Sequence, residues 1–231
     1  MINIGDIISY IDMCQEEGVN LQRGMNYKLK GRMSVILMSV RPGSPYADKV
    51  EEDGRVLIYE GHDVPKSTEF PDPKAVDQPY KNPGGTLTQN GLFFEAARLA
   101  KAGLREPEIV KVYEKIKSGI WVFNGLFKLM AAWTQVINKR KVFKFRLEII
   151  DDILRVKDDK NIELDHKRII PSWVKIEVWK RDKGKCVVCG SEDNLHFDHI
   201  IPYSKGGSSL VPQNIQLLCA RHNLEKKDKI Q

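Results

Sequence analysis

The sequence predicts an α+β fold with two units, a curved and strand-rich unit followed by a small unit that a metal ion stabilises. Three observations predict this. Short apolar runs rich in β-branched and aromatic residues recur between Gly, Pro and Asp residues, whereas few segments have helical spacing. Three of the four cysteines fall within residues 186–219, near the end of a 231-residue chain. Such clustering is typical of a metal site rather than of disulfides.

The overall composition narrows the class of protein. The formal net charge of +6 is compatible with a polyanionic partner but does not by itself establish one. No apolar run approaches the roughly 20 residues that span a bilayer, so we expect no membrane association. The opening sequence MINIGDIISYIDMCQEEG has early acidic residues and no basic segment of a signal peptide. Together with the cysteine pattern, this favours a reducing, cytoplasmic location.

The first unit is predicted to contain two helices among many strands. Apolar residues recur at helical spacing over residues 3–17, and Gly18 ends that helix. A second, capped helix is expected over residues 86–103, after Pro- and Asp-rich loops in residues 61–85. Apolar runs predict the strands, at residues 33–40, 55–61, 108–116, 119–133 and 140–150. Many strands and few helices favour a curved sheet or barrel.

Changes in composition predict the boundaries between units. Residues 1–29 form an N-terminal helical segment, and residues 30–150 form the strand-rich unit. Residues 151–170 are charged, lack a strong period and are predicted to be a linker. Residues 171–231 form the second unit, which is too small to build a large core without additional stabilisation.

Two pairs of metal-binding residues explain how the second unit is stabilised. Cys186 and Cys189 form a C-x-x-C pair, and Cys219 and His222 follow as C-x-x-H about 30 residues later. Three thiolates and one imidazole form the closed, four-ligand set of a structural zinc site. The binding free energy of the metal then contributes to folding. The sequence therefore predicts a structural Zn²⁺ that needs neither Asp198 nor His199.

The segments HFDHIIP and PQNIQLLCARHN, with Gly206 and Gly207 between them, resemble the HNH endonuclease family. The resemblance covers residues 171–231 and implies a ββα-metal fold. It places His199 at the first H, Asn214 at the N and Asn223 at the last position, where this sequence has Asn instead of His.

This resemblance implies metal-dependent hydrolysis of phosphodiester bonds. Asp198 and Asn223 offer oxygen ligands to a catalytic Mg²⁺ or Mn²⁺. His199 is the general base, since an imidazole titrates near neutral pH. Asn214 is expected to hold the loop backbone and to orient His199. Lys205 is a candidate for contact with the DNA backbone.

Four segments of the first unit resemble the SRA (YDG) domain family, in the order SPYADKVEEDGRVLIYEG, TLTQNGLFFEAA, VKVYEKIKSGIWVFNGLFKLMAAW and KVFKFRLE. The motif that names the family reads Phe-Asn-Gly here, at residues 123–125. The resemblance implies a curved, barrel-like fold that flips a modified cytosine out of duplex DNA. It also implies that Tyr46 and Tyr59 stack on the flipped base and that Asp48 accepts a hydrogen bond from its amine. Asn90 and Gly91 are expected near the backbone of that nucleotide.

The two resemblances together imply a modification-dependent restriction endonuclease that acts on double-stranded DNA carrying 5-methylcytosine or a related base. Since one HNH site usually cuts one strand, a homodimer is a possible arrangement, with the N-terminal helix as a candidate interface. Two alternatives remain. The first is an HNH nickase or homing-type nuclease that reads sequence rather than modification. The second is a non-catalytic reader of methylated DNA.

Overall fold

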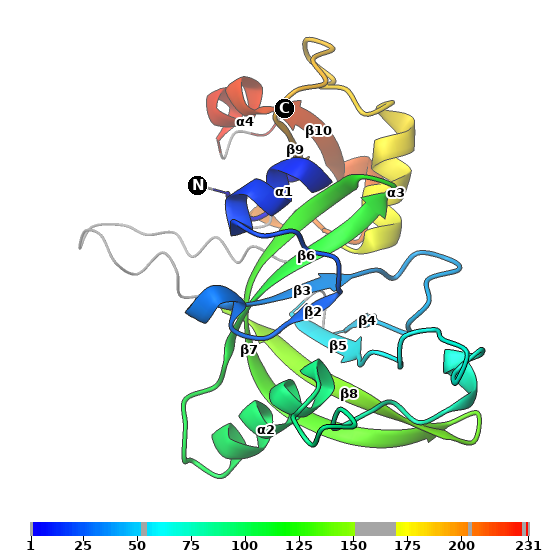
Figure 1. The fold of residues 1–231 in the computed structure, drawn as a ribbon. Helices are drawn as coiled ribbons and strands as arrows, with labels where there is room; N and C mark the ends of the chain where they lie inside the picture. Colours follow the sequence, from blue (N-terminus) through cyan, green and yellow to red (C-terminus); the bar gives the residue numbers. More distant parts are fainter. Residues whose placement is uncertain (1, 52–54, 151–169, 203–204, 228–229, 231) are drawn as a thin grey trace.

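The computed structural model describes residues 2–51, 55–150, 170–202, 205–227 and 230. Its main feature is a strongly bent sheet, which Figure 1 shows below the C-terminal module. The strand order is β2-β3-β6-β7-β8-β5-β4, and β1 pairs separately with β7. The pairs are antiparallel except for β3 and β6, which are parallel. The strands are β1 (Ile7–Ser9), β2 (Met25–Asn26), β3 (Ser34–Met38), β4 (Lys49–Glu51), β5 (Val56–Glu60), β6 (Ile109–Lys117), β7 (Ile120–Ile137) and β8 (Arg140–Ile149).

The predicted α+β class is confirmed, but the sheet does not close into a barrel. Within the described residues, its two ends are β2 and β4, which do not pair with each other. The curvature comes from bulges, which shift the β6–β7 register between Val112 and Tyr113 and the β7–β8 register between Leu129 and Ala131. The first bulge lies opposite Gly125, whose φ of +106° suits glycine.

The N-terminal helix is shorter than the sequence predicts. Helix α1 covers Tyr10–Glu17, capped by the Ser9 hydroxyl and ended by Gly18 in the left-handed conformation. The preceding Ile7–Ser9 is strand β1, because it pairs with residues 120–122 of β7. Pairing with a distant strand outweighs the helical spacing of its isoleucines. Helix α2 (Gln89–Lys101) is capped by Thr88 and buries Phe93 against the sheet.

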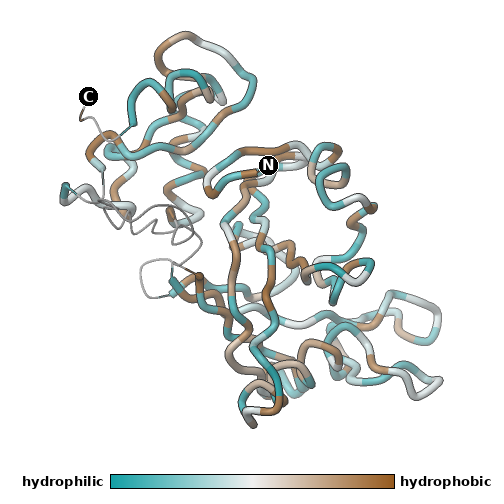
Figure 2. Tube along the Cα trace, turned by 90° about the vertical axis from the view of Figure 1, so that its left-hand side faces the viewer, coloured by the Kyte–Doolittle hydropathy of each residue, from teal (hydrophilic) through white to brown (hydrophobic). Residues whose placement is uncertain are grey.

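Three buried clusters hold the fold together. The largest lies between α2 and the curved sheet and includes Phe127, Phe145 and Leu147. Strands β3 and β5 are buried along most of their length, and Figure 2 shows runs of hydrophobic residues along the tube. A second cluster packs α1 on the sheet through Met13, which is fully buried. Short 3₁₀ turns occur at Leu29–Gly31, Pro73–Ala75 and Pro212–Asn214.

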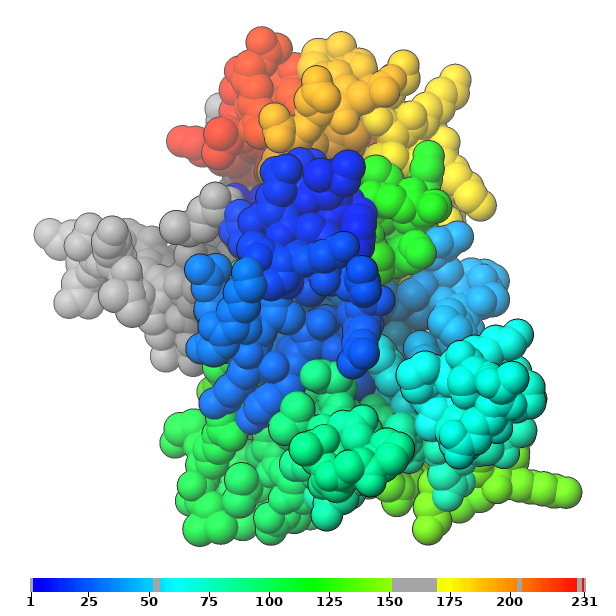
Figure 3. Space-filling model, viewed as in Figure 1, coloured from blue at the N-terminus to red at the C-terminus, as the bar shows by residue number. Residues whose placement is uncertain are grey.

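The C-terminal module contains α3 (Ser172–Arg181), the hairpin strands β9 (Leu195–His199) and β10 (Ile215–Cys219), and α4 (Ala220–Lys226). The predicted linker lies almost wholly in residues 151–169, outside the described residues. The third cluster joins this module to the sheet, because Ile116 and Val122 of β6 and β7 pack with Val174 and Val178 of α3. Figure 3 shows the module lying directly on the N-terminal segment and the β6–β7 hairpin.

A buried polar network crosses the same contact. Glu114 of β6 is 0% exposed, and its carboxylate lies 2.5 Å from the Lys175 ammonium of α3. Asn124 of β7 donates to Glu114 at 2.9 Å and accepts from Lys175 at 2.7 Å, while the Ser172 hydroxyl also donates to Glu114. A buried charge is tolerated only when it is paired and hydrogen-bonded, so this contact requires the two units to stay together.

In the described part of the chain no helix is long and apolar enough to cross a membrane.

Candidate metal centre, active site and aromatic pocket

The four predicted zinc ligands lie together at the ends of the β9–β10 hairpin and α4. Their ligand atoms all fall within 4.8 Å of one another. The Cys189 and Cys219 sulfurs are 3.8 Å apart, and Nδ1 of His222 lies 3.3 Å from the Cys219 sulfur and 3.5 Å from the Cys186 sulfur. A tetrahedral zinc with Zn–S bonds of about 2.3 Å sets its sulfurs about 3.8 Å apart. The cluster therefore fits Zn²⁺.

The electrostatics of this cluster favour a thiolate at Cys186. Burial raises the pKa of the Cys186 thiol, but hydrogen bonds from the backbone amides of Cys219, Cys189 and Val188 and from the His222 side chain bring it down to about 6. Zinc binds the deprotonated thiolate, so this residue is prepared for a metal at neutral pH.

The predicted metal ligand Asp198 has an ion-pair partner that the sequence does not reveal. Its Oδ2 lies 2.9 Å from the Lys226 ammonium, and that ammonium also donates to the His199 carbonyl at 2.6 Å. Lys226 is only 3% exposed, although it lies on the terminal helix α4. Gln216, opposite Asp198 in the hairpin, donates to the same Oδ2 at 3.2 Å. These contacts fix the direction in which the carboxylate points.

His199 is the last residue of β9, and its side chain diverges from that of Asp198. Its Nε2 lies 2.8 Å from the Ser209 hydroxyl, and Ser209 is 3% exposed. Strand alternation predicts this divergence. The Ser209 contact holds the ring in one orientation, which is what a general base requires.

Asn214 is hydrogen-bonded to the backbone of the loop that follows His199. Its Oδ1 accepts from the amide of Ile201 at 2.8 Å, and its Nδ2 donates to the carbonyls of Ile201 and Ser208, each at 3.1 Å. A side chain at Gly207 would collide with the Ile201 carbonyl. Glycine is therefore required for the loop to close on Asn214. The Asn214 carbonyl also accepts from the amide of Ile200, next to His199.

The remaining predicted residues of the nuclease module lie around this site. Asn223 is half-buried and lies one turn before Lys226 on α4, so the two share a helix face. Lys205 is exposed on the loop after β9. His196 pairs with Asp6 of the N-terminal segment, with Nδ1 and Oδ1 2.7 Å apart. It therefore contributes to the contact between the two units.

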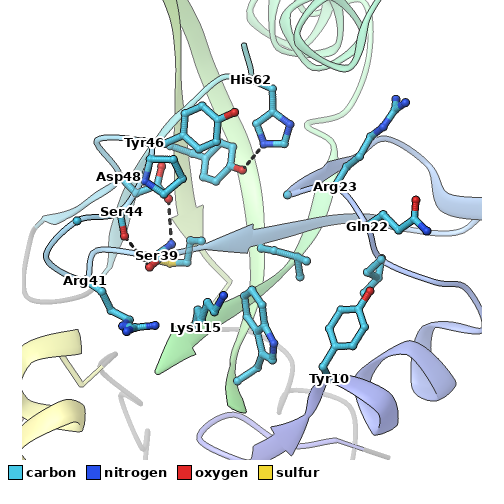
Figure 4. A pocket seen from close by; sticks show the side chains of 18 of the residues that line it. Tyr10, Gln22, Arg23, Ser39, Arg41, Ser44, Tyr46, Asp48, His62 and Lys115 are labelled. Atoms are coloured by element: carbon cyan, nitrogen blue, oxygen red, sulfur yellow. Dashed lines mark hydrogen bonds between the residues drawn. The ribbon is translucent and has the colours of Figure 1, made fainter. Parts of the chain in front are cut away.

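A large cavity opens on the concave side of the sheet. It measures about 820 Å³ and is lined by the three residues predicted to hold a flipped base, Tyr46, Tyr59 and Asp48. Figure 4 shows Tyr46 and Asp48 beside one another at the cavity. Tyr59 comes from β5 and is 1% exposed, whereas Tyr46 and Asp48 come from the loop before β4. Arg23, Arg41 and Lys115 line the same cavity.

Backbone hydrogen bonds hold Asp48 at the cavity, whereas its neighbour Lys49 points away from it. Asp48 accepts from the amides of Ser39 and Glu60, each at 3.0 Å, whereas Lys49 is exposed and does not line the cavity. Burial raises the pKa of Asp48 to about 7, against the lowering effect of those two amides. The carboxyl group therefore changes charge near neutral pH.

The structure places Asn90 and Gly91 inside the protein. Asn90 is 1% exposed, and its amide is hydrogen-bonded to the backbone N–H and carbonyl of His62 and to the Pro79 carbonyl. Gly91 is buried against Tyr80. Neither residue is therefore positioned to contact a DNA backbone. Asn90 instead fixes His62, whose contact with both tyrosines is not apparent from the sequence.

Residues 186–229 match the family model described as HNH endonuclease. None of the curated proteins compared matches the chain. Among solved structures, the chain is similar to the SUVH5 SRA domain in complex with hemimethylated CG DNA, with 24% identity, a TM-score of 0.45, and coverage of 64% of this chain and 89% of that one. The same domain bound to fully hydroxymethylated CG DNA gives 22% identity, a TM-score of 0.43, and coverage of 64% and 89%.

SUVH6 of Arabidopsis thaliana in complex with SAM gives 20% identity and a TM-score of 0.43, with coverage of 75% of this chain and 28% of that one. The predicted resemblance of the C-terminal module to the HNH endonuclease family is thus confirmed over residues 186–229.

Proposed function

We propose that this protein is a modification-dependent DNA endonuclease. The aromatic cavity would receive a modified cytosine flipped out of duplex DNA, and the C-terminal module would hydrolyse a phosphodiester bond of the same duplex. The observation that carries the proposal is the shared cavity of Tyr46, Tyr59 and Asp48 in a chain whose C-terminal module matches the HNH endonuclease family.

The cavity has the chemistry that a flipped cytosine requires. Extrusion of a base costs a few kcal/mol, and stacking on an aromatic ring returns about 1 to 3 kcal/mol per base. An ionised Asp48 accepts from the exocyclic amine of cytosine, which distinguishes cytosine from thymine. Arg23, Arg41 and Lys115 place positive charge where the DNA strand would pass.

In the nuclease module each residue has a separate task. His199, held by Ser209, would take the proton from the attacking water. Asn214 keeps the loop after His199 in place. Asp198 and Asn223 would hold a divalent Mg²⁺ or Mn²⁺, which stabilises the charge that develops on the phosphate. A Zn²⁺ held by Cys186, Cys189, Cys219 and His222 would be structural, since all four coordination positions are taken by protein.

Matched duplexes test the proposal directly. The protein is incubated with Mg²⁺ or Mn²⁺ and with duplexes of one sequence that carry cytosine, 5-methylcytosine or 5-hydroxymethylcytosine. We expect cleavage of at least one modified duplex and little cleavage of the plain one, with cleavage by His199→Ala reduced at least about 100-fold. Equal cleavage of all three would instead support a nuclease that reads sequence. Preferential binding without cleavage under any metal would support a non-catalytic reader.

A further inference from the structure

We propose that His62 is an internal competitor for the flipped base, because its imidazole stacks on Tyr46 where that base would stack. The base would enter only by displacing this ring. The inference rests on the proposed function and adds to it an internal competitor for the base.

His62 stacks on Tyr46 in the way that a bound base would. Its ring lies nearly parallel to that of Tyr46, with an interplanar angle of 14° and centroids 5.1 Å apart. Its Nε2 lies 2.9 Å from the Tyr59 hydroxyl, and the two ring centroids are 6.1 Å apart. His62 thus contacts both of the aromatic side chains proposed to hold the base, and Figure 4 shows it close to Tyr46.

The other face of Tyr46 is not open to a base. The Lys74 ammonium lies 4.3 Å from the centroid of the Tyr46 ring. Tyr46 lines two cavities, of which His62 lines the larger and Lys74 the smaller, which is consistent with contacts on different faces of the ring. Lys74 is anchored by the Pro45 carbonyl and by Asp63, 2.8 Å away. Since Tyr59 lines the larger cavity and not the smaller, a base that uses both rings must take the His62 face.

His62 can leave this face only by rotation of its side chain. Asn90 holds its backbone from both sides, with the His62 amide donating to Oδ1 and the His62 carbonyl accepting from Nδ2, each at 2.8 Å. Among the described residues, the ring itself is held by a hydrogen bond with Tyr59 and by its contacts with the rings of Tyr46 and Tyr59. Burial lowers the pKa of His62 to about 4, so the imidazole is neutral at physiological pH and stacks as an uncharged ring.

Entry of a flipped base into the cavity therefore has an energetic cost. Displacement of His62 breaks its stacking on Tyr46 and its hydrogen bond with Tyr59. This cost is the same for every base that enters the pocket, and stacking of the base on the two tyrosines must offset it. His62 would therefore reduce the affinity for every flipped base by the same factor, without changing binding that depends only on phosphate contacts. Gly24 packs directly against the pair of Tyr59 and His62, since a Cβ at Gly24 would lie 2.7 Å from the Tyr59 hydroxyl and 2.8 Å from Nε2 of His62.

The test measures dissociation constants for a duplex with one 5-methylcytosine and for its unmodified match, in a His199→Ala background that prevents cleavage. We expect His62→Ala to bind the methylated duplex about 3- to 30-fold more tightly, because entry of the base no longer breaks an aromatic contact and a hydrogen bond. The unmodified duplex, which binds mainly through phosphate contacts, should gain less, so the ratio between the two rises. His62→Phe, which keeps an aromatic ring on Tyr46, should show no such gain.

Two further variants separate this role from a structural one. Tyr59→Phe removes only the hydroxyl that holds His62, so it should also tighten binding, by a smaller factor. Lys74→Met uncovers the opposite face of Tyr46 and should give no gain. Weaker or unchanged binding by both His62→Ala and Tyr59→Phe, with unchanged melting temperature, would overturn the inference. If the parent protein itself does not prefer the methylated duplex, the proposed function fails and His62 has no base to compete with.

Discussion

The ammonium group of Lys226 lies 2.9 Å from the carboxylate of Asp198 and closes a buried contact between the last helix and the strand that carries the predicted general base. This pair leads to the first prediction. Lys226→Met should lower the rate of cleavage about tenfold, because Asp198 loses the partner that fixes its direction. The mutant should also need less Mg²⁺ for half-maximal activity, since a competing positive charge is gone.

A Mg²⁺ titration of the cleavage rate measures both effects. Lys227→Met is the matched control, because Lys227 is adjacent but exposed. A Lys226→Met enzyme with parental rate and parental Mg²⁺ requirement would contradict this role.

The second prediction concerns His199. His199→Ala should reduce cleavage by about 10²- to 10⁴-fold and leave DNA affinity within a factor of about two, because a general base acts in the transition state. Ser209→Ala should have a smaller effect, about tenfold, since it loosens the ring without removing it. Single-turnover rates together with dissociation constants check both variants. A fully active His199→Ala enzyme is incompatible with the assignment.

The third prediction is a pH dependence of base recognition. The pKa of Asp48 is raised to about 7, so this carboxyl group is mostly protonated at pH 6 and mostly ionised at pH 8. Only the ionised form is a pure acceptor for the cytosine amine, so affinity for the methylated duplex should rise between pH 6 and pH 8. Two charged neighbours also act on the pKa of Asp48: Glu60 raises it, and Lys144 lowers it. Asp48→Asn should distinguish the methylated from the unmodified duplex poorly, and its affinity should not change between pH 6 and pH 8. If the affinity of Asp48→Asn rises as it does in the parent protein, Asp48 is not the source of the pH dependence.

The fourth prediction concerns Tyr59. Tyr59→Ala should weaken binding of the methylated duplex about 5- to 150-fold by loss of one stacking ring. Binding of unmodified DNA should persist and should weaken steeply with salt, because phosphate contacts do not depend on the base. Titrations at two or more salt concentrations distinguish the two components. An equal loss on both duplexes would indicate damage to the fold rather than to the pocket.

The fifth prediction concerns the metal centre. Purified protein should contain about one zinc per chain, and Cys186→Ser should unfold the C-terminal module, because metal binding contributes to the folding of so small a unit. Cys14→Ser is the control, since Cys14 lies outside the ligand cluster. Elemental analysis and thermal melting with and without a chelator provide the measurements. Active protein free of zinc would refute the prediction.

The sequence predicts the features that depend on local spacing. The zinc ligands follow from two short motifs, and long strands such as β7 follow from their apolar runs. Strand β1 is missed because its three residues become a strand only through pairing with β7. Lys226 resembles a surface lysine in the sequence, since nothing in its neighbourhood along the chain shows that Asp198 lies beside it.

The aromatic pocket likewise contains contacts that the sequence does not predict. Tyr46 and Tyr59 can be proposed from the order of motifs, but their contact with His62 depends on how loop and strand meet in space. The sequence suggests Asn90 as a DNA contact because it begins a helix, but the direction of that helix end is set by tertiary packing. Its hydrogen bonds with His62 show that it points inward.

The buried contact of Glu114 with Lys175 has a further consequence for the pattern of DNA fragments. A nuclease tethered only by a loose linker would reach many bonds and leave ends scattered over several positions. A nuclease fixed to the sheet reaches bonds at one set spacing from the flipped base, so the protein would act as a molecular ruler. We expect end-labelled fragments to cluster at a constant offset from the modification. Replacement of the charged pair by Gln and Met should broaden that distribution without abolishing the cut.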